Sequence, residues 1–307
     1  MIYFIVNKQS RTGKGALIWR EIRTILKEKG ISYKSFYTEY KGHATKLAKN
    51  LSSNLKEEIK LVVVGGDGTV NEVINGIVDF EKVCFGIIPT GSGNDFARGL
   101  GIKGDIRQHV ERIISGKQIE RIDLGCVSYG DNKSRYYGIS SGIGMDAIVC
   151  KKALNSKLKT FLNRFHIGKL TYLILTIQTL FSMETAKVKV RFDNKTIKSF
   201  NRLIFCAAMN FRAEGGGVPM APRADAKDGK LSLCFAHGIP KWKTFFMLPL
   251  LVLAKHEKLS CFYITECKTC EIKLSKPVVA HADGEYLGDV SSIFYECLPG
   301  KLKIIIQ

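Results

Sequence analysis

One glycine-rich stretch combines an acid and a threonine at a spacing that suits phosphate binding. The apolar run 61–64 leads into Gly-Gly-Asp-Gly-Thr at 65–69, and apolar residues at helical spacing follow. Glycines let the backbone bring its N–H groups close to a ligand, and a helix N-terminus adds further donors. Asp67 would repel bare phosphate, so it favours a metal ion shared with a nucleotide. The stretch predicts a strand, a phosphate-binding turn and a helix, with an ordinary capped turn as the alternative.

Two other polar loops carry groups of the same kind. Lys14 stands where the loop after the first strand enters a helix, although this loop lacks the pattern of a Walker A sequence. Asn94 and Asp95 follow Pro-Thr-Gly-Ser-Gly at 89–93 and lie near the start of a short helix. Asn94 suits an N-cap as well as a ligand, whereas we expect Asp95 to face the same sheet edge as Asp67.

A second acidic motif, Asp-Gly-Glu at 283–285, ends a predicted strand near the C-terminus. Two carboxylates around a glycine can serve as a general base and its partner in proton transfer. A plain hairpin turn explains the same residues. The other motifs must therefore decide between a catalytic pair and a turn.

Alternating strands and helices bring the three polar loops to one edge of a sheet. Apolar residues at helical spacing predict helices over 16–29 and 43–55, between the strands. This alternation indicates a parallel sheet, in which ligands bind at the carboxyl ends of the strands. The strands are predicted at 2–6, 31–38, 61–64 and 83–88.

The pattern changes after residue 124. Short alternating strands indicate a mostly antiparallel second domain, and the last stretch, 301–307, is a strand that returns to the first domain. We therefore predict an α/β protein with two domains: a nucleotide-binding α/β domain over 1–124 plus about 291–307, and a β-rich, sandwich-like domain over 125–290. The strands of the second domain are predicted at 124–129, 135–141, 186–192, 203–209, 230–235, 261–265, 269–274 and 278–282.

The composition is that of a basic globular chain of 307 residues, with 45% hydrophobic residues and a net charge of +19. This charge favours a phosphorylated ligand, an anionic membrane surface or nucleic acid. No apolar run approaches the roughly 20 residues that span a bilayer, and the N-terminus does not read as a signal peptide. Nine cysteines with one lone Cys-x-x-Cys at 267–270 favour reduced thiols in a cytoplasmic protein over a zinc site.

Two apolar segments, 170–181 and 245–254, have basic surroundings, and the wider segment 147–183 contains no acid. Basic flanks around an apolar helix suit contact with an anionic membrane surface. Two core helices with basic rims are the alternative. The basic residues are Lys151, Lys152, Lys157, Lys159, Arg164 and Lys169 in the first segment, and Lys241, Lys243, Lys255 and Lys258 around the second.

Taken in order, these motifs resemble those of the bacterial diacylglycerol kinase–like lipid kinases. The glycine motif is followed by Asn-Glu at 71–72, by Pro-x-Gly-x-Gly-Asn-Asp-Phe-Ala-Arg at 89–98 and by Asp-Gly-Glu at 283–285. The resemblance covers essentially the whole chain. It implies transfer of the γ-phosphoryl group of ATP, with Mg²⁺, to a lipid hydroxyl, with diacylglycerol foremost. It also implies a cytoplasmic enzyme that associates peripherally with an anionic membrane surface and can form a homodimer.

The resemblance implies roles for single residues. Glu285 matches the proton acceptor of the family, and Asp283 is the other acid of its motif. The charged network that holds Mg²⁺ and phosphates would comprise Lys14, Asp67, Asp95 and Asp123. The ATP site would be lined by Asn7, Thr38, Gly65, Gly66, Asp67, Gly68, Thr69, Asn71 and Thr90. A structural Mg²⁺ in the second domain would be held by Asp225, Asp228 and the carbonyl of Lys230.

The chain departs from the family pattern in two places. Lys8 replaces the proline that usually follows the first-loop asparagine, Asn7. Lys227 replaces one of the paired acids of the structural metal motif. The second change removes an oxygen ligand, so the structural metal has a weaker donor set than the catalytic one.

Rival functions follow from the same features. An NAD kinase shares the glycine motif but usually continues with Leu and a small residue, and it lacks the Asn-Asp-Phe-Ala-Arg block. A nucleic-acid binder would suit the charge, but the sequence has no basic and aromatic patch, and the acids at the ligand edge would repel a phosphate backbone. We therefore expect no nucleic-acid partner. Among lipids, monoacylglycerol, sphingoid bases, phosphatidylglycerol and isoprenoid alcohols all remain open as acceptors.

Overall fold

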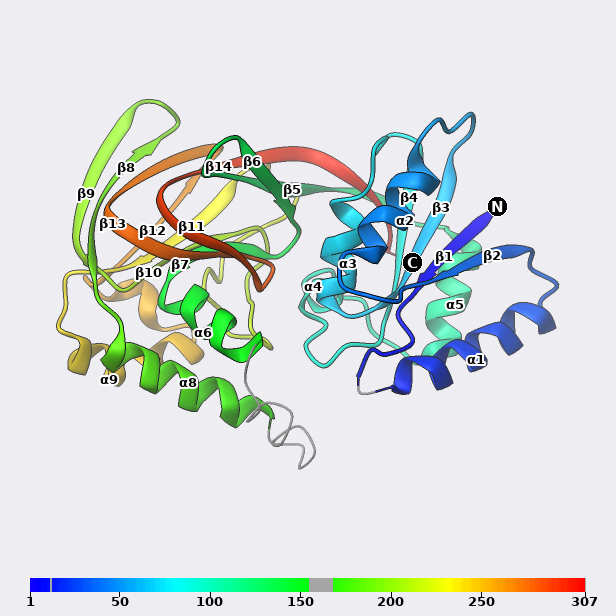
Figure 1. Ribbon diagram of the computed structural model, residues 1–307, viewed down its shortest axis with the longest axis horizontal. Coiled ribbons are helices and arrows are strands. Elements are labelled where there is room, and N and C mark those ends of the chain that lie inside the picture. The colour runs from blue at the N-terminus through cyan, green and yellow to red at the C-terminus, as the bar shows by residue number, and fades with distance from the viewer. Residues whose placement is uncertain (12, 155–167, 307) are drawn as a thin grey trace. The chain divides into compact units, whose positions relative to one another are not determined.

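The computed structural model describes residues 1–11, 13–154 and 168–306 (Figure 1). The chain forms two compact units: unit 1 contains Met1–Leu124 and Pro299–Gln307, and unit 2 contains Gly125–Leu298. The predicted two-domain α/β class is confirmed. Three basic residues of the acid-free segment lie outside the described residues: Lys157, Lys159 and Arg164.

Unit 1 is built on an open parallel sheet in the order β14-β4-β3-β1-β2. The register places Val6 opposite both Tyr37 and Val64, and the last residues of β14 pair with β4 at Ile304 and Phe85. The apolar run of β3 is buried almost throughout, as a central strand covered on both faces requires. The strands are β1 (Ile2–Val6), β2 (Tyr33–Tyr37), β3 (Ile59–Gly65), β4 (Val83–Pro89) and the end of β14 (Glu285–Ile305).

The helices of unit 1 pack on this sheet through apolar stripes. Helix α1 buries Trp19, Ile22 and Leu26, and the Trp19 ring lies 5.3 Å from that of Phe4 in β1. This helix begins earlier than its apolar stripe predicts, because Gly13 turns the chain with φ 91° immediately before it. The helices are α1 (Lys14–Glu28), α2 (His43–Ser52), α3 (Asp67–Ile74), α4 (Asp95–Gly99) and α5 (Ile106–Ser115).

Unit 2 is β-rich, and its antiparallel sheet has the order β12-β11-β10-β7-β13-β14. Strand β10 is buried on both faces: Cys206 and Ala208 enter one apolar core, while Phe205 and Ala207 enter another. The strands of unit 2 not yet given are β5 (Ile119–Tyr129, from residue 125), β6 (Lys133–Tyr137), β7 (Ser140–Gly144), β8 (Ala186–Phe192), β9 (Thr196–Leu203), β10 (Phe205–Met209), β11 (Leu231–Ala236), β12 (Phe262–Cys267) and β13 (Thr269–Ala282).

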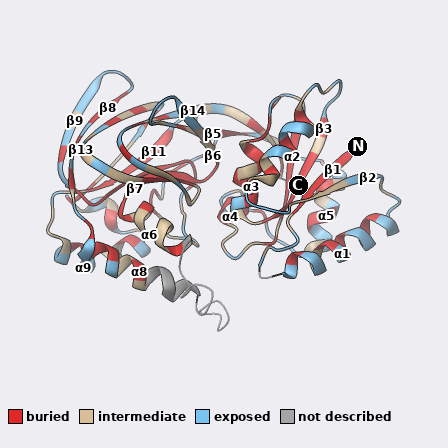
Figure 2. Cartoon of the chain, viewed as in Figure 1, coloured by how far each residue is buried: buried red, intermediate tan, exposed pale blue. Residues whose placement is uncertain are grey.

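Among the described residues of unit 2, one side of the sheet is covered by the helices α6 (Met145–Leu154), α8 (Gly168–Ser182) and α9 (Lys241–Val252). Strands β7, β10 and β11 are buried throughout, whereas α9 is partly exposed (Figure 2). A short 3₁₀ helix, η1 (His256–Lys258), follows α9. No helix within the described ranges is long and apolar enough to cross a membrane.

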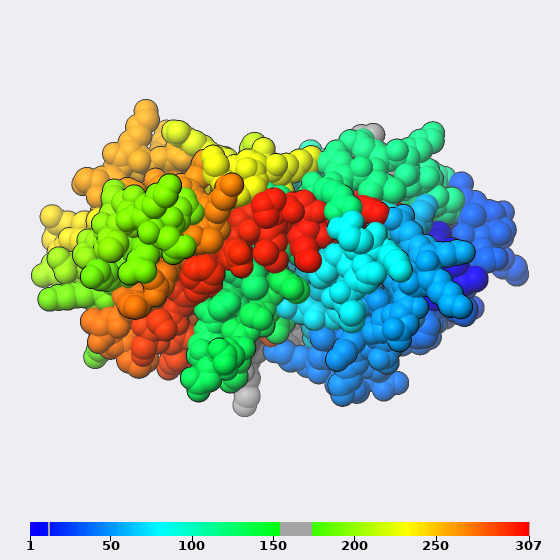
Figure 3. All heavy atoms as spheres, turned by 90° about the horizontal axis from the view of Figure 1, so that it is seen from above, coloured from blue at the N-terminus to red at the C-terminus, as the bar shows by residue number. Residues whose placement is uncertain are grey.

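The strands differ from their predicted bounds in several ways. The strand predicted at 135–141 is divided between β6 and β7, because the chain bends at residues 138–139. Strand β14 begins at Glu285, although a strand was predicted only over 301–307. The strands predicted at 269–274 and 278–282 form one long strand, β13, which is continuous across an irregularity in register between Lys273 and Val278. Strand β9 was not predicted, because most of its residues are polar and exposed and only Phe200 and Leu203 are buried. It pairs with β8 as a hairpin, which lies on the surface shown in light green in Figure 3.

Candidate active site

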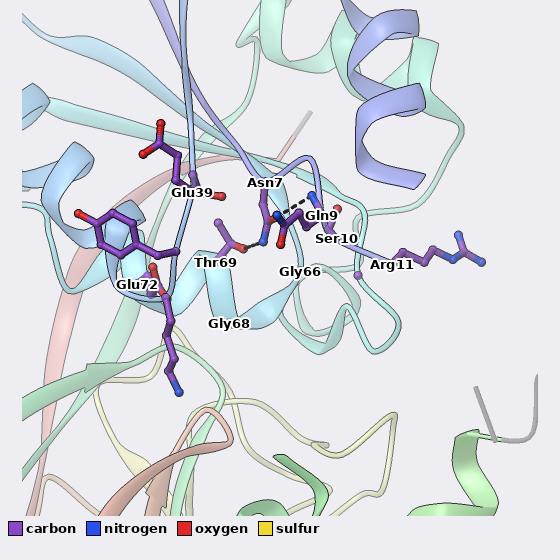
Figure 4. Close-up of a pocket in the computed structure, with 13 residues that line it drawn as sticks. Asn7, Gln9, Ser10, Arg11, Glu39, Gly66, Gly68, Thr69 and Glu72 are labelled. Atoms are coloured by element: carbon purple, nitrogen blue, oxygen red, sulfur yellow. Dashed lines mark hydrogen bonds between the residues drawn. The ribbon is translucent and has the colours of Figure 1, made fainter. Parts of the chain in front are cut away.

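A pocket of about 470 Å³ lies in unit 1 where β1, β2, β3 and β4 end (Figure 4). Each of the four loops contributes to its lining, as the edge rule for parallel sheets predicts. Five residues predicted for the ATP site line it: Asn7, Thr38, Gly66, Gly68 and Thr69. Eight further residues were not predicted: Gln9, Ser10, Arg11, Glu39, Tyr40, Lys41, Glu72 and Gly91.

Asn7 and Thr69 hold the first and third loops together. The Asn7 Nδ2 atom donates a hydrogen bond of 3.1 Å to Thr69 Oγ1, and Asn7 Oδ1 accepts one of 3.0 Å from the Gln9 backbone N–H (Figure 4). Gly65 is required beneath this pair, because a Cβ there would lie 2.7 Å from the Thr69 Cβ. The loop geometry therefore depends on the residue types that the sequence places at 7, 65 and 69.

The loops after β3 and β4 meet glycine to glycine. A Cβ on Gly91 would lie 2.7 Å from the Gly66 Cα and 2.8 Å from Asn94 Oδ1. Asn94 closes its loop by accepting from the Gly91 N–H at 2.8 Å and donating to the Gly91 carbonyl at 3.1 Å. Asn94 therefore shapes the pocket wall through backbone bonds, and its own side chain does not cap α4.

Because backbone meets backbone here, we expect Gly91→Ala to push the two loops apart. The expected result is a melting temperature several degrees lower, consistent with an overpacking cost of about 1–3 kcal/mol, together with weaker nucleotide binding. Thermal denaturation and titration with ATP measure both effects. Ser92→Ala, a change at an exposed position of the same loop, is the matched control. Unchanged ATP affinity in Gly91→Ala would show that the contact between Gly66 and Gly91 does not determine nucleotide binding.

Asp67 and Asp95 converge on Gly93. A Cβ on Gly93 would lie 3.1 Å from Asp67 Oδ2 and 3.4 Å from Asp95 Oδ2. Asp67 Oδ1 accepts a hydrogen bond of 3.0 Å from the Phe96 N–H, and Asp95 pairs with Arg98, whose Nη2 also donates to the Gly93 carbonyl at 2.7 Å. Two carboxylates gathered at one loop form an oxygen donor set of the kind that Mg²⁺ prefers.

Glu72 has a local role that the sequence motif alone did not reveal. Its carboxylate accepts from the backbone N–H groups of Gly42 at 2.9 Å and Ala44 at 3.2 Å. These are donors at the start of α2, where the N-cap Gly42 has no side chain to serve them. The acid after Asn71 therefore caps a neighbouring helix and fixes the loop that carries Thr38 and Tyr40 over the pocket.

Four other predicted residues of unit 1, Thr90, Asn71, Lys14 and Asp123, are not among those that line the pocket. Thr90 is buried, and its Oγ1 lies 2.7 Å from Ser10 Oγ, which joins the fourth loop to the first. Asn71 is buried within α3, and Lys14 is exposed at the first position of α1. Asp123 is buried in β5, and its Oδ1 accepts from the Gly300 N–H at 2.7 Å.

In unit 2 the Asp283 carboxylate is engaged by backbone. Its Oδ2 accepts from the Gly138 N–H at 2.8 Å, and its Oδ1 accepts from the N–H groups of Ile139 and Ser140 at 2.9 and 3.0 Å. Asp283 and Gly284 both have positive φ, at 47° and 82°. Asp283 thus anchors the turn that presents Glu285 at the start of β14.

A partly buried cluster beside this turn contains Asp146, Glu214 and the buried His281, whose potential ligand atoms all lie within 4.8 Å of one another. The His281 Nδ1 accepts from the Gly284 N–H at 3.2 Å, which leaves the proton on Nε2, 3.3 Å from Asp146 Oδ2. A protonated Nε2 donates to a carboxylate and cannot bind a metal. The geometry therefore favours a hydrogen-bonded support for the turn over a metal centre.

We expect His281→Leu to destabilise unit 2, because it leaves the buried Asp146 carboxylate without its imidazole donor. The expected loss of unfolding free energy is about 3 kcal/mol. The double variant Asp146→Asn/His281→Leu should recover part of this loss, since Asn keeps the oxygen that accepts from the Ala147 N–H but carries no charge. Urea denaturation measures both. A double variant no more stable than the single one would contradict this account.

The predicted structural metal loop lies between Ala224 and β11. Asp225 Oδ1 accepts from the Lys227 N–H at 3.1 Å, and Asp228 Oδ1 accepts from the Lys230 N–H at 2.9 Å. The Lys230 ammonium lies 3.3 Å from Glu266 Oε2. The two acids therefore shape the turn, and their role as metal ligands stays a prediction.

The cysteines of the Cys-x-x-Cys sequence, Cys267 and Cys270, are both buried and unbridged. Burial, with the hydrogen bond to Cys267, raises the pKa of the Cys270 thiol well above its ordinary value. A thiol that resists ionisation is a poor zinc ligand.

Comparison with known proteins gives consistent results along the whole chain. Residues 1–127 match the family model of the diacylglycerol kinase catalytic domain, and residues 140–306 match the YegS C-terminal NAD kinase beta sandwich-like domain. The Bacillus subtilis (strain 168) protein named "Putative lipid kinase YtlR" is 30% identical over 293 residues, which cover 93% of each chain.

Two further similarities extend this result. The diacylglycerol kinase of Staphylococcus carnosus (strain TM300) is 28% identical over 276 residues, covering 89% of this chain and 85% of its own. A crystal structure described as a "putative diacylglycerol kinase" from Bacillus anthracis str. Sterne matches with a TM-score of 0.76 at 23% identity, covering 99% of this chain and 96% of that one. The structural match shows the fold.

Proposed function

Because the chain belongs to the diacylglycerol kinase–like lipid kinase family, we propose that it transfers the γ-phosphoryl group of ATP to a lipid hydroxyl, with diacylglycerol as the acceptor. The observation that carries the proposal is the pocket at the strand ends of unit 1. It is lined by glycines and polar groups of four loops, including Asn7, Gly66 and Thr69. Such a lining suits a polyphosphate, because backbone N–H groups can approach it closely.

The carboxylates of Asp67 and Asp95 fit the Mg²⁺ that accompanies ATP. When bound, the ion offsets negative charge on the phosphoryl oxygens. The chain's own residues would contribute positioning: the Gly66–Gly91 contact fixes the loops, and Lys14, exposed at the start of α1, would supply a cation for phosphate. Phosphoryl transfer requires mainly such positioning and charge compensation.

We assign the proton acceptor to Glu285. Both oxygens of Asp283 accept backbone N–H groups, so this carboxylate is committed to holding the turn. Glu285 stands one residue after the turn and is partly exposed. A general base must reach the acceptor hydroxyl, and Glu285 stands directly after the anchored turn, at the start of β14.

The test is transfer of labelled γ-phosphate from ATP with Mg²⁺ to candidate acceptors in mixed micelles. The panel contains diacylglycerol, monoacylglycerol, sphingosine, phosphatidylglycerol and undecaprenol, with NAD in a parallel reaction. Label in diacylglycerol is the expected result, and omission of Mg²⁺ should abolish it. Label in another lipid would show that the acceptor is not diacylglycerol but would still agree with lipid phosphorylation. Label only in NAD would overturn the proposal.

The lipid acceptor implies an anionic membrane surface as partner and a cytoplasmic enzyme that binds there peripherally. The net charge of +19 supports this proposal. Homodimer formation is part of the same proposal, and sedimentation equilibrium tests it.

A further inference from the structure

Helix α9 is apolar on two sides. Thr244 and Leu251 are buried, and Met247 and Leu248 pack against the core that α9 shares with α6 and α8. A second set of apolar residues faces solvent at helical spacing. This set, called the α9 stripe, consists of Trp242, Phe245, Phe246, Val252 and Leu253, which are 39–61% exposed.

The α9 stripe is unusual for a surface helix. Water-exposed faces of helices normally carry polar residues, and contiguous exposed apolar groups mark a surface that contacts something apolar. Two aromatic residues of the stripe, Phe245 and Phe246, contact each other with ring centroids 5.5 Å apart. Phe181, at the end of α8, is 55% exposed. Its carbonyl accepts from the Lys241 ammonium at the start of α9, so it lies beside the stripe.

The charges around the stripe point to one kind of partner. Lys243 is exposed near the start of α9, and Lys255 and Lys258 are exposed shortly after its end. The single acid in residues 237–260, Glu257, pairs with Arg223 at 3.2 Å. An apolar stripe with a basic rim complements an anionic bilayer, into whose interface aromatic residues insert while lysines remain among the headgroups.

We propose that the α9 stripe docks the protein on anionic lipid bilayers. The biological role of this docking rests on the proposed function, because the lipid acceptor of the reaction lies in a bilayer. The sequence left open whether segment 245–254 is a core helix or a membrane contact. In the structure one face of α9 serves the core and the opposite face carries the stripe.

The protein contains its own probe for this docking. It has two tryptophans, of which Trp19 is buried and hydrogen-bonded to Tyr37 while Trp242 is 57% exposed. Vesicles of phosphatidylglycerol and phosphatidylcholine should shift the Trp242 emission to shorter wavelength and carry the protein into the pellet on sedimentation. Pure phosphatidylcholine vesicles and high salt should weaken both signals, because screening removes the attraction of the lysines.

Two variants test the residues. We expect Phe245→Ser/Phe246→Ser to reduce vesicle binding at least tenfold, and Lys243→Glu/Lys255→Glu to remove the preference for anionic lipid. The matched controls are Ile197→Ser and Lys195→Glu, both at exposed positions of the β8–β9 hairpin, which should bind like the unchanged protein. Melting temperatures show that each variant is folded.

The outcomes separate docking from catalysis. Phosphorylation of a short-chain diacylglycerol dissolved as monomers should be unchanged in Phe245→Ser/Phe246→Ser. Vesicle binding without any phosphoryl transfer would contradict the proposed function but support the proposed docking surface. Undiminished vesicle binding by Phe245→Ser/Phe246→Ser would overturn the docking proposal. A second result would also overturn the docking proposal: the unchanged protein is a dimer, and Phe245→Ser/Phe246→Ser is a monomer that still binds vesicles. In that case a second copy of the chain covers the stripe.

Discussion

Asp67→Asn should lower the rate of phosphoryl transfer about a thousandfold, in line with the loss of one charge-stabilising group in an active site, and should leave the melting temperature nearly unchanged. Asparagine keeps the Oδ1 atom that accepts from the Phe96 N–H, so the contact between the two loops survives. What is lost is the negative charge beside Asp95 that would hold Mg²⁺. The change therefore tests the charge at this position and spares the shape of the loop.

The measurement is the initial rate of lipid phosphorylation over a titration with Mg²⁺, beside thermal denaturation. Asp105 offers a control carboxylate in the same unit, because it forms a capping box with Gln108 at the start of α5, away from the pocket lining. Asp105→Ala should show the reverse pattern, a loss of stability of about 1 kcal/mol with retained activity. A rate for Asp67→Asn within tenfold of the unchanged protein would remove Asp67 from the metal site.

The two acids of the Asp-Gly-Glu motif should respond in opposite ways. Glu285→Gln should reduce turnover by a factor of about 10²–10⁴, the usual contribution of a general base, without loss of stability. Asp283→Asn replaces an acceptor of three N–H groups by an amide that can match them only in part. Since hydrogen bonds to a charged group contribute about 1.5–3 kcal/mol each, we expect Asp283→Asn to lower the melting temperature by several degrees.

Single-turnover kinetics and thermal denaturation of the two variants decide the assignment. Activity in Asp283→Asn should recover at temperatures where the variant remains folded, because the loss acts through the turn. The activity of Glu285→Gln should not recover at any temperature. If Glu285→Gln retained full turnover while folded Asp283→Asn was inactive, the roles of the two acids would be exchanged.

The first unit could be predicted well because its signals are local. The buried run of β3 and the glycines after it are contiguous in the sequence, and each strand end carries its own polar loop. The pocket could be predicted in part for the same reason. Its residues Tyr40 and Lys41 were missed, because their loop has a single glycine, Gly42, and no glycine-rich motif. The carboxylate that fixes this loop, that of Glu72, comes from another helix.

The second unit was harder to predict because its determinants are distant in the chain. The N–H groups that engage Asp283 belong to residues 138–140, more than a hundred positions earlier. No local pattern distinguishes that anchored carboxylate from the neighbouring Glu285. Strand β9 shows the same limitation, since its place is set by pairing with β8 and its own residues are largely polar.

The split of unit 1 between the two ends of the chain determines when this unit can form during synthesis. Its sheet is completed by the last residues of β14, where Leu302, Ile304 and Ile305 are fully buried. A ribosome must therefore make all of Gly125–Leu298 before this part of the sheet leaves the exit tunnel. Until then the edge of β4 stays open to pairing with other chains, a known route to aggregation. Unit 2 is contiguous and can fold first, so unit 1 matures last.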